Sequence, residues 1–576
     1  SEVFSMNDIN ALYSLWCEKA VADPDLEKEL SSIEGKAEEI NDRFYRNLEF
    51  GTAGLRGIIG AGTNRMNVYT VNQATQGLAS YLLSEYESPS VAIAYDSRIK
   101  STDFAKSAAG VLAANGIKVY IYPELVPTPM LSFAVRELHC KGGIIITASH
   151  NPAEYNGYKC YDPEGYQMTD EAAARTYDFI LKTDMFSGVK SMDFEKGIES
   201  GLIEYIGDEV VQKFYDCVEK CCLSKEITAR TDLRVIYTPL NGTGNKHVRA
   251  MLKRIGIKNV SVVKEQEYPD GNFPTCPYPN PEIKQVFECA IKMTENEKAD
   301  LLLATDPDCD RVGIAVLDNG DYKLMTGNEV GVLLAEYLLS RRKELGTLPK
   351  NAVVVKSFVT TDLVDIVCKK YGASVKKLLT GFKYIGEYIT ELEAKGEADR
   401  FVVGMEESYG YLSGIHARDK DAVVASTLIC EMAAYYKEKG ISLYEKMQEI
   451  YAEHGYYLNR VESFEFKGET GMEKMAQIME SLRKSSPSFI AGYEVLESSD
   501  YKKSETLNHK TGAVAKIDLP KSNVLSFALA NSNGVIIRPS GTEPKIKVYF
   551  TARGKTKEEA EKIFASLSSD MKQYLK

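Results

Sequence analysis

The sequence lacks any hydrophobic run long enough to cross a membrane. Its longest apolar stretches, such as residues 142–147 and 300–304, have the length of a β-strand and fall far short of the ~18 residues that indicate a transmembrane helix. Basic residues are also in deficit, with 70 Lys and Arg against 82 Asp and Glu and a net charge of −12. Because this balance repels nucleic acids and anionic membranes, we expect neither as a partner. Any phosphate that the protein binds is expected to be small and held locally.

Signals for secretion and for zinc binding are missing too. The N-terminal stretch has acidic residues where a secretory signal has a basic region, and it has no apolar core, so a cytoplasmic location is expected. The 11 cysteines are scattered, and their one cluster, Cys217, Cys221 and Cys222, has no histidine and no second cluster nearby. This spacing does not make a zinc site. We expect free thiols in a reducing compartment.

What the sequence does contain is a repeated order of apolar strand, loop and helix. A chain of 576 residues is long enough for about four domains. Strand-like runs within 91–147 are followed by two further sets within 233–317 and 353–405, and unbroken apolar strands between helices indicate α/β sheets covered on both faces. The last stretch, with strands followed by a terminal helix, predicts an α+β domain. We place the four domains at 1–205, 206–322, 323–455 and 456–576.

Four polar loops are associated with such strands, and the first is TASHNPAEYNGYK at 147–159. It comes directly after the apolar run GGIIIT and is therefore expected at the carboxyl end of a parallel strand, where the ligand sites of α/β proteins concentrate. Ser149, next to His150 and followed by Pro152, is in a position to accept and return a phosphoryl group. An ordinary strand-to-helix turn with Ser149 as its cap is the alternative.

The second loop, DPDCDR, also follows an apolar strand. Asp306, Asp308 and Asp310 stand at alternate positions, so their carboxylates can converge on one hard cation such as Mg²⁺ or Ca²⁺. Without a cation they would repel one another. A calcium EF-hand is disfavoured because no Glu stands at the twelfth position of such a loop. A solvated acidic turn is the remaining alternative.

The third loop carries groups suited to a sugar. GMEESYGYL at 404–412 offers Glu406 and Ser408 as hydrogen-bond partners for hydroxyl groups, and Arg418 and Lys420 follow shortly after in HARDKDAV. The two basic residues could bind a phosphate or act as acid or base. Taken alone, such a charged turn could equally be solvated surface.

The fourth loop is RPSGTEPK at 538–545, between two apolar strands. An arginine fork, two hydroxyls and a glycine are the parts of a phosphate-binding turn, and a plain hairpin turn is the alternative. Together the four loops supply a nucleophile, a divalent cation site, substrate contacts and neutralisation of an anion. These are the components that phosphoryl transfer requires.

In this order, TASHNP, DPDCDR, GMEES and RPSGTEPK closely resemble the α-D-phosphohexomutase superfamily, and the chain is most similar to its longer phosphoglucomutase/phosphomannomutase members. Further matching stretches are EFGTAGLRG, AYDSR, NGYK, FPTCPYPNPE and TGFKYIG. The resemblance runs from Glu49 to about Lys547. It implies four domains around a central cleft, three of them similar mixed α/β sheet domains and the fourth a smaller C-terminal α+β domain.

The resemblance also implies roles for individual residues. Ser149 is expected to be the phosphoserine and to share a Mg²⁺ with Asp306, Asp308 and Asp310. The residues expected in phosphoryl transfer or proton handling are Arg56, His150, Lys159 and Lys420. Those expected to bind the substrate are Arg311, Gly381, Phe382, Lys383, Glu406, Ser408, Arg418, Arg538, Ser540, Gly541 and Thr542.

Two departures from relatives affect the expected chemistry. Cys309 stands where relatives often carry Ala or Gly, which adds a thiol near the metal without removing a ligand. Residues 409–411, Tyr-Gly-Tyr, replace a histidine-bearing form of some bacterial relatives. The remaining candidates for the acid and the base are Lys159, Lys420 and His416.

The function implied is that of a phosphosugar mutase, an isomerase that interconverts hexose 1-phosphate and hexose 6-phosphate, of glucose or mannose, through a phosphoserine and a bisphosphorylated sugar. It would require Mg²⁺ and a sugar 1,6-bisphosphate as activator, and it would act as a monomer or homodimer. A phosphopentomutase or a sugar-1,6-bisphosphate synthase of the same superfamily is the alternative, since the motif at 406–408 does not separate these activities. A non-catalytic phosphosugar-binding protein is the alternative of another class, although the intact Ser149 and aspartates argue against it.

Overall fold

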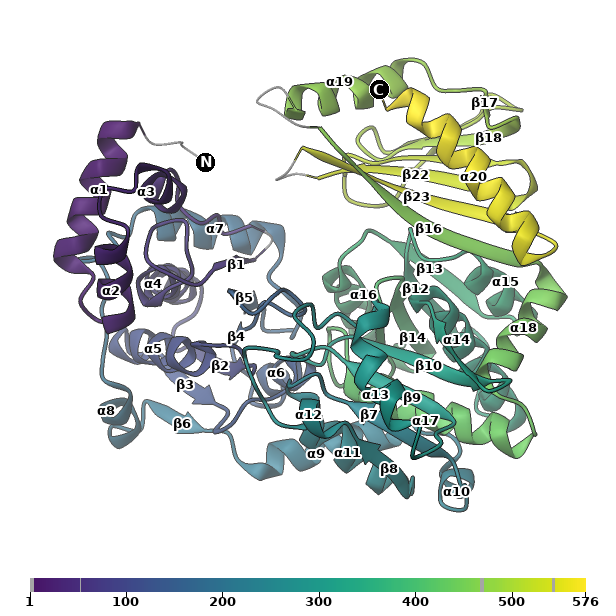
Figure 1. Cartoon of the computed structure of the whole chain (residues 1–576), viewed down its shortest axis with the longest axis horizontal. Helices are drawn as coiled ribbons and strands as arrows, with labels where there is room; N and C mark the ends of the chain where they lie inside the picture. Colours follow the sequence, from purple (N-terminus) through teal and green to yellow (C-terminus); the bar gives the residue numbers. More distant parts are fainter. Residues whose placement is uncertain (1–4, 52, 467–470, 541–543, 576) are drawn as a thin grey trace.

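The computed structural model describes residues 5–51, 53–466, 471–540 and 544–575. Figure 1 shows three α/β units and a fourth unit, built on antiparallel strands, that stands over the third. Three helices precede the first unit: α1 (Met6–Lys19), α2 (Pro24–Ser32) and α3 (Ala37–Phe44). They pack on it through Trp16, whose ring meets that of Tyr69 edge-on at 5.5 Å.

The first unit contains a six-stranded sheet in the order β1-β5-β4-β2-β3-β6. Its strands are β1 (Gly54–Ile58), β2 (Ser90–Tyr95), β3 (Lys118–Ile121), β4 (Gly142–Ile146), β5 (Tyr155–Tyr161) and β6 (Ile203–Tyr205). Its helices are α4 (Val68–Glu85), α5 (Ser101–Ala114), α6 (Thr128–Glu137), α7 (Asp170–Leu181) and α8 (Phe194–Glu199). β4, β2, β3 and β6 run parallel, whereas at one edge β5 is antiparallel to β4 and β1 is antiparallel to β5. β4 is buried throughout, as its apolar sequence predicts.

The second unit has a five-stranded sheet in the order β11-β10-β9-β7-β8. Its strands are β7 (Arg234–Thr238), β8 (Asn259–Val262), β9 (Leu301–Thr305), β10 (Val312–Asp318) and β11 (Asp321–Met325). Its helices are α9 (Asp208–Lys220), α10 (Lys225–Thr228), α11 (Gly244–Arg254), α12 (Lys264–Glu267) and α13 (Glu288–Met293), with a 3₁₀ turn η1 (Lys284–Phe287). β7, β8 and β9 are parallel and β10 and β11 antiparallel, so DPDCDR forms the turn between β9 and β10.

The third unit has a four-stranded sheet in the order β13-β12-β14-β15, parallel except for β15. Its strands are β12 (Val353–Ser357), β13 (Ser374–Leu378), β14 (Phe401–Glu406) and β15 (Gly410–Leu412). Its helices are α14 (Gly327–Glu344), α15 (Leu363–Lys370), α16 (Phe382–Ala394), α17 (Ala422–Glu438) and α18 (Leu443–His454), with a 3₁₀ turn η2 (Ala398–Arg400).

The fourth unit is an antiparallel sheet in the order β16-β23-β22-β21-β18-β19-β20, with β17 paired to β18. Its strands are β16 (Tyr456–Glu465), β17 (Phe489–Ile490), β18 (Tyr493–Asp500), β19 (Glu505–Asn508), β20 (Val514–Lys516), β21 (Leu525–Leu529), β22 (Gly534–Pro539) and β23 (Lys545–Gly554). Its helices are α19 (Gly471–Lys484) and α20 (Lys557–Tyr574), with a 3₁₀ turn η3 (Ala530–Ser532). The predicted class, three mixed α/β units followed by an α+β unit, is confirmed.

The hydrophobic core shows which units form one body. Side chains of the first three units share a core that includes Phe133 on α6, Phe214 on α9 and Leu333 on α14, and the rings of Phe133 and Phe214 lie 5.7 Å apart. The fourth unit has a core of its own, which includes Phe527 and Phe550. The first three units therefore pack as one body to which the fourth is attached.

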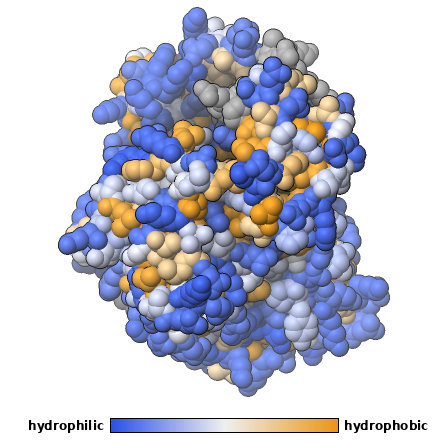
Figure 2. Space-filling view, turned by 90° about the vertical axis from the view of Figure 1, so that its left-hand side faces the viewer, coloured by the Kyte–Doolittle hydropathy of each residue, from blue (hydrophilic) through white to orange (hydrophobic). Residues whose placement is uncertain are grey.

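The surface is mainly polar. On the face that carries α1 and α2, Figure 2 shows that hydrophilic residues cover most of the area and hydrophobic residues form only small groups. Within the described part of the chain, none of the helices combines the length and the apolar character needed to cross a bilayer.

Candidate active site

All four units border one cavity of about 890 Å³. The loops after β4 and β9, the end of β14 and the strand β22 each contribute to its lining. The residues expected from the sequence that line it are His150, Arg311, Gly381, Phe382, Lys383, Glu406, Ser408, Lys420 and Arg538. The cavity volume is in the range of small-molecule sites, and the fold thus brings the predicted loops to one cleft.

Ser149 stands on a strained turn at the end of β4. Its φ of +53° is in the left-handed region, which few residues other than glycine adopt, and its amide donates to Thr147 Oγ1 at 2.8 Å. Ser149 Oγ lies 3.2 Å from His150 Nδ1 and donates to Asp306 Oδ2 at 3.0 Å. The hydroxyl therefore faces the DPDCDR loop of the second unit, and backbone strain of this kind is concentrated at active sites.

A buried arginine to which the sequence analysis gave no role, Arg98, holds this turn. Its guanidinium donates hydrogen bonds of 2.5 to 3.0 Å to four main-chain carbonyls, those of Ser149, Asn151, Pro152 and Tyr155. Asp96 lies 3.4 Å from Arg98 and accepts from Thr147 Oγ1 at 2.6 Å. Both residues belong to AYDSR, one of the stretches that match relatives, and that match was the available signal of their importance.

The three aspartates of DPDCDR form a buried cluster. Each offers one carboxylate oxygen within 4.8 Å of the others, and Asp306 Oδ1 accepts from the amides of Asp310 and Arg311 at 3.0 and 2.9 Å. Burial and the charges of Asp308 and Asp310 raise the pKa of Asp306 well above its ordinary value. Such a cluster is unfavourable unless a cation neutralises it.

The unused oxygens of this cluster fit a divalent cation. Of the polar atoms in the described residues, Asp308 Oδ1 and Asp310 Oδ1 are among the few that are buried without a hydrogen-bond partner. The other oxygen of each is occupied, because Thr128 Oγ1 donates to Asp308 Oδ2 at 3.0 Å and Lys420 lies 3.1 Å from Asp310 Oδ2. A set made only of carboxylate oxygens suits a hard cation such as Mg²⁺.

Two lysines from different units flank the aspartates. Lys159 Nζ, on β5, lies 3.4 Å from Asp308 Oδ2, and Lys420 Nζ, in the loop between β15 and α17, lies 3.1 Å from Asp310 Oδ2. Burial lowers the pKa of Lys420, but the charges of Asp310 and Asp419 outweigh it and raise the pKa above its ordinary value. Lys420 therefore stays protonated at neutral pH and is suited to neutralising an anion.

Arg56 and His150 lie close to the serine turn. The Arg56 guanidinium extends from β1 and donates to Asn151 Oδ1 at 3.1 Å. Burial, together with the charges of Arg311 and Arg56, lowers the pKa of His150 to about 3. The ring is therefore neutral at physiological pH, and it can hydrogen-bond to Ser149 Oγ without carrying charge.

The third unit supplies the polar wall of the cleft. Glu406 Oε1 accepts from the amide of Gly381 at 2.7 Å, which joins GMEES to TGFKYIG. Ser408 lines the same wall. Across the cleft, Lys383 Nζ donates to Asp170 Oδ1 at 2.6 Å and so links the third unit to the first.

Arg311 reaches into the cavity from the second unit. Its guanidinium donates to Glu282 Oε1 at 2.8 Å, and both residues line the cavity. The sequence analysis did not assign Glu282 a role, although it lies in FPTCPYPNPE, one of the stretches that match relatives.

The fourth unit contributes Arg538, which lines the cavity from β22. The amide of Ser540 donates to the carbonyl of Lys545 at 2.8 Å, so the ends of β22 and β23 lie side by side there. Gly541 and Thr542, which were also expected to bind the substrate, lie outside the described residues.

Two of the expected residues that do not line the cavity are bonded to other parts of the protein. Arg418 is fully buried and donates to Thr390 Oγ1 at 3.1 Å and to Glu393 Oε2 at 2.7 Å, and burial lowers its pKa to about 10. His416 Nε2 lies 2.8 Å from Asp421 Oδ2, inside the third unit. Because the Arg418 guanidinium is hydrogen-bonded to protein partners, its geometry does not support the expectation that it contacts the substrate. His416 is bonded to Asp421 through Nε2, and its role as acid or base stays a prediction.

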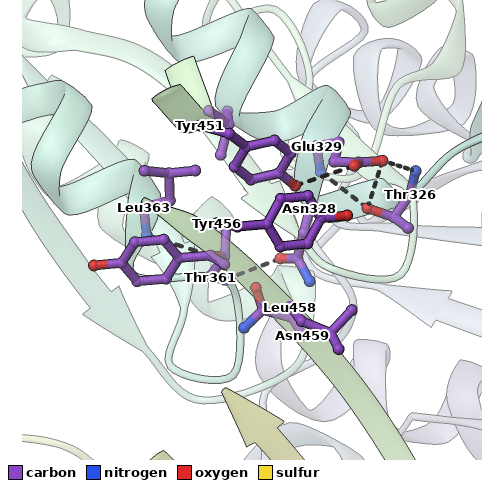
Figure 3. A pocket seen from close by; sticks show the side chains of 11 residues that line it. Thr326, Asn328, Glu329, Thr361, Leu363, Tyr451, Tyr456, Leu458 and Asn459 are labelled. Atoms are coloured by element: carbon purple, nitrogen blue, oxygen red, sulfur yellow. Dashed lines mark hydrogen bonds between the residues drawn. The ribbon is translucent and has the colours of Figure 1, made fainter. Parts of the chain in front are cut away.

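A second, smaller hollow lies where the third and fourth units join (Figure 3). It measures about 50 Å³, which holds only one or two water molecules. Tyr451 OH donates to Glu329 Oε1 at 3.0 Å, its ring stacks on that of Tyr456 at 4.2 Å, and the amide of Thr361 donates to Asn328 Oδ1 at 2.9 Å. These contacts make the hollow a packed junction between units rather than a ligand site.

The four units match one protein family. The description "Phosphoglucomutase/phosphomannomutase, alpha/beta/alpha domain I" matches residues 47–186. Domain II of that family matches residues 212–320, domain III residues 326–454 and the C-terminal domain residues 494–568. Together these ranges cover most of the chain.

Individual proteins are similar over nearly their whole length. A phosphoglucomutase of Staphylococcus saprophyticus is 37% identical over 515 residues, which are 89% of this chain and 92% of that protein. A phosphoglucomutase of Staphylococcus haemolyticus is 36% identical over 88% of this chain and 91% of that protein. In structure, the chain resembles the open form of the phosphoglucomutase parafusin from Paramecium with a TM-score of 0.66, at 19% identity, over 92% of this chain and 95% of that one. The last comparison supports the fold alone.

Proposed function

The chain belongs to the phosphoglucomutase/phosphomannomutase family, and we propose that it interconverts hexose 1-phosphate and hexose 6-phosphate, with glucose or mannose as the sugar. It is a phosphohexose mutase, an intramolecular phosphotransferase. The observation that carries the proposed mechanism is the 3.0 Å contact between Ser149 Oγ and Asp306 Oδ2. This contact brings a candidate nucleophile of the first unit against a cation-binding loop of the second.

In the proposed reaction, a phosphoryl group on Ser149 Oγ passes to the free hydroxyl of a hexose monophosphate. The bond between phosphorus and Ser149 Oγ breaks as a bond to the sugar oxygen forms, and the proton of the sugar hydroxyl ends on Ser149. The resulting hexose bisphosphate reorients in the cleft, so that its other phosphoryl group faces Ser149 and is transferred to it. A cavity of about 890 Å³ leaves room for this reorientation.

Around the serine, positive charges hold the transferring group. Lys159, Lys420 and Arg56 come from three different segments and are placed to neutralise the phosphoryl oxygens. A Mg²⁺ held by Asp306, Asp308 and Asp310 would supply further electrostatic stabilisation of those oxygens.

Away from the serine, the substrate is held by its hydroxyl groups and its second phosphate. Glu406 and Ser408 present hydrogen-bonding groups to the sugar from the third unit. Arg538 lines the same cavity from the fourth unit, and we propose that its turn binds the phosphate that is not reacting. Free hexose 1,6-bisphosphate would restore the phosphoserine after loss of the intermediate, which makes it the expected activator.

The proposal is tested by a substrate panel. Glucose 1-phosphate, mannose 1-phosphate and ribose 1-phosphate are compared in coupled assays with Mg²⁺ and catalytic amounts of the matching bisphosphate. Turnover of a hexose phosphate is expected to exceed that of ribose 1-phosphate. A clear preference for ribose 1-phosphate, or net synthesis of bisphosphate, would replace the hexose assignment.

The role of Ser149 is tested by Ser149→Ala, with Ser426→Ala as matched control because that serine is also buried but lies within α17, outside the loop that follows β4. Ser149→Ala is expected to abolish the conversion and to remove the phosphoserine signal in mass spectrometry, whereas the control retains both. Substantial turnover by Ser149→Ala would remove this residue from the mechanism.

A further inference from the structure

A buried hydrogen bond joins the first and third units directly behind the candidate site. Tyr161 OH donates to Asp419 Oδ2 at 2.6 Å, across 258 residues of sequence. Both side chains are buried, at 0% and 4% exposure. Tyr161 is the last residue of β5, and Asp419 lies in the loop between β15 and α17. The bond therefore connects two segments that fold as parts of different units.

Each of the bonded residues is a close neighbour of one of the two lysines that flank the aspartates. Lys159 precedes Tyr161 by two positions on β5, so both side chains leave the strand on the same face. Lys420 directly follows Asp419, and Asp419 Oδ1 accepts from its amide at 2.8 Å and lies 3.3 Å from its Nζ. One hydrogen bond thus links the backbone segments of both lysines.

Each of the two lysines contacts a different aspartate. Lys159 Nζ lies 3.4 Å from Asp308 Oδ2 and Lys420 Nζ lies 3.1 Å from Asp310 Oδ2. If β5 shifted relative to the loop between β15 and α17, one lysine would move away from its aspartate while the other stayed in contact. Phosphoryl transfer is sensitive to such misplacement, because a displacement of about 1 Å can cost on the order of 100-fold in rate.

We propose that Tyr161 and Asp419 are positioning residues, whose hydrogen bond sets the separation of Lys159 and Lys420 around the transferring phosphoryl group. The inference rests on the proposed function. Asp419 bonds directly to Lys420, and Tyr161 shares its strand face with Lys159, so the two residues act through the lysines rather than on the substrate. The bond is of the strong, charge-assisted kind, because a neutral hydroxyl donates to a carboxylate.

Other contacts support the idea that this loop is held against the first unit. The amide of Arg418 donates to Ser132 Oγ on α6 at 2.8 Å, one residue before Asp419. The Arg418 guanidinium shares Glu393 with Arg136 of α6, at 2.7 and 2.9 Å. These contacts hold the loop at Arg418, and the Tyr161 bond lies one residue nearer to Lys420.

The test compares Tyr161→Phe with Tyr158→Phe in the full-length protein, using glucose 1-phosphate with Mg²⁺ and catalytic glucose 1,6-bisphosphate. Tyr158 is a matched control because it lies on the same strand, is also fully buried, and has its hydroxyl bonded to Thr75 Oγ1 at 3.1 Å on the other face of the sheet. Each variant loses one buried hydroxyl, and Tyr161→Phe is expected to lose more thermal stability because it leaves the buried Asp419 carboxylate without its donor.

Tyr161→Phe is expected to lower kcat by on the order of 10-fold while KM stays within about 2-fold, because the substrate contacts are intact and only the transfer step is disturbed. Tyr158→Phe is expected to keep the wild-type kcat. Equal kcat values for the two variants, or an effect of Tyr161→Phe on KM alone, would overturn the proposal. A wild-type protein that turns over no phosphosugar would instead refute the proposed function, and the inference with it.

A double-mutant cycle that combines Tyr161→Phe with Asp419→Ala is a second, independent test of the proposal. If the two residues act through one bond, Tyr161→Phe should add nothing to the kcat loss already caused by Asp419→Ala. Fully additive losses would show that the side chains act separately and would also overturn the proposal.

Discussion

The guanidinium of Arg98 donates to the carbonyl of Ser149 at 2.5 Å and to that of Asn151 at the same distance. The strained turn that carries Ser149 is thus held by a charged group on a neighbouring strand end. Because the guanidinium bonds to main-chain carbonyls of the turn, the Ser149 hydroxyl is left to donate to Asp306. Rigid placement of a nucleophile is a property that group transfer requires.

Replacing Arg98 should destabilise the protein. Arg98→Met leaves Asp96 as an unpaired buried charge and removes the hydrogen bonds to the carbonyls of the turn, and breaking a buried pair typically costs about 3–5 kcal/mol. A large fall in the midpoint of urea unfolding is expected. The control Arg175→Met breaks an ion pair with Glu85 at the surface and should leave the midpoint nearly unchanged. Equal unfolding midpoints for the two variants would contradict the conclusion that Arg98 stabilises the turn that carries Ser149.

Mg²⁺ should stabilise the folded protein through the aspartates. A ligand that binds only the folded state adds about 2.7 kcal/mol of stability at 100 times its Kd, so the thermal midpoint of the wild type is expected to rise with Mg²⁺ concentration. Asp308→Asn should abolish this rise, because it removes a carboxylate with a free oxygen. Asp321→Asn, an exposed position in the same unit, should behave as wild type. A Mg²⁺-dependent rise that survives Asp308→Asn would place the ion elsewhere.

Glu407 should make stability depend on pH. Burial and the neighbouring Glu406 raise the pKa of Glu407 from its ordinary 4.5 to about 7. Between these values the folded state keeps a proton that the unfolded state releases, so the contribution of Glu407 to the free energy of unfolding falls as pH rises from about 4.5 to 7 and stays low above it.

This dependence is measured with Glu407→Gln, which keeps a neutral group beside Ser357. Urea unfolding at pH 5, 6, 7 and 8 is expected to show the wild type losing stability relative to the variant, by roughly 2–3 kcal/mol in total. Glu494→Gln, at an exposed position, serves as the control. A constant difference between wild type and Glu407→Gln across this range would contradict the raised pKa.

Gly455 joins α18 to β16 and so connects the third unit to the fourth. Its φ of 97° and ψ of 158° lie in a region that is essentially confined to glycine, and a Cβ would come within 3.0 Å of the Arg553 side chain. Gly455→Ala is expected to lower the free energy of unfolding by about 1–3 kcal/mol. Gly534→Ala, in the same unit and with only ordinary contacts for its Cβ, is expected to cost little. A smaller loss of unfolding free energy for Gly455→Ala than for Gly534→Ala would show that the backbone at position 455 accommodates a side chain without strain.

Much of the architecture could be predicted because it depends on local pattern. The apolar runs of β4, β9 and β14 are buried strands, and their alternation with helices predicts α/β units. The combination of parallel and antiparallel strands in the first three sheets could not be predicted from local pattern, since strand direction depends on pairing with distant strands. The domain boundaries after residues 205, 322 and 455 stay a prediction.

By itself, the sequence determined which chemical groups the protein carries and in what order: a serine after one buried strand, three alternating aspartates after another, and two polar loops. These follow from residue type and spacing, which are local properties. Only the tertiary structure decided which of two nearly adjacent basic residues reaches the cleft. Lys420 lies against Asp310, whereas Arg418 forms an ion pair with Glu393. It also decided that Arg98 supports Ser149 and that Tyr161 bonds to Asp419. Such pairings depend on the packing of segments far apart in the chain, and burial then forces each polar group to find a partner there.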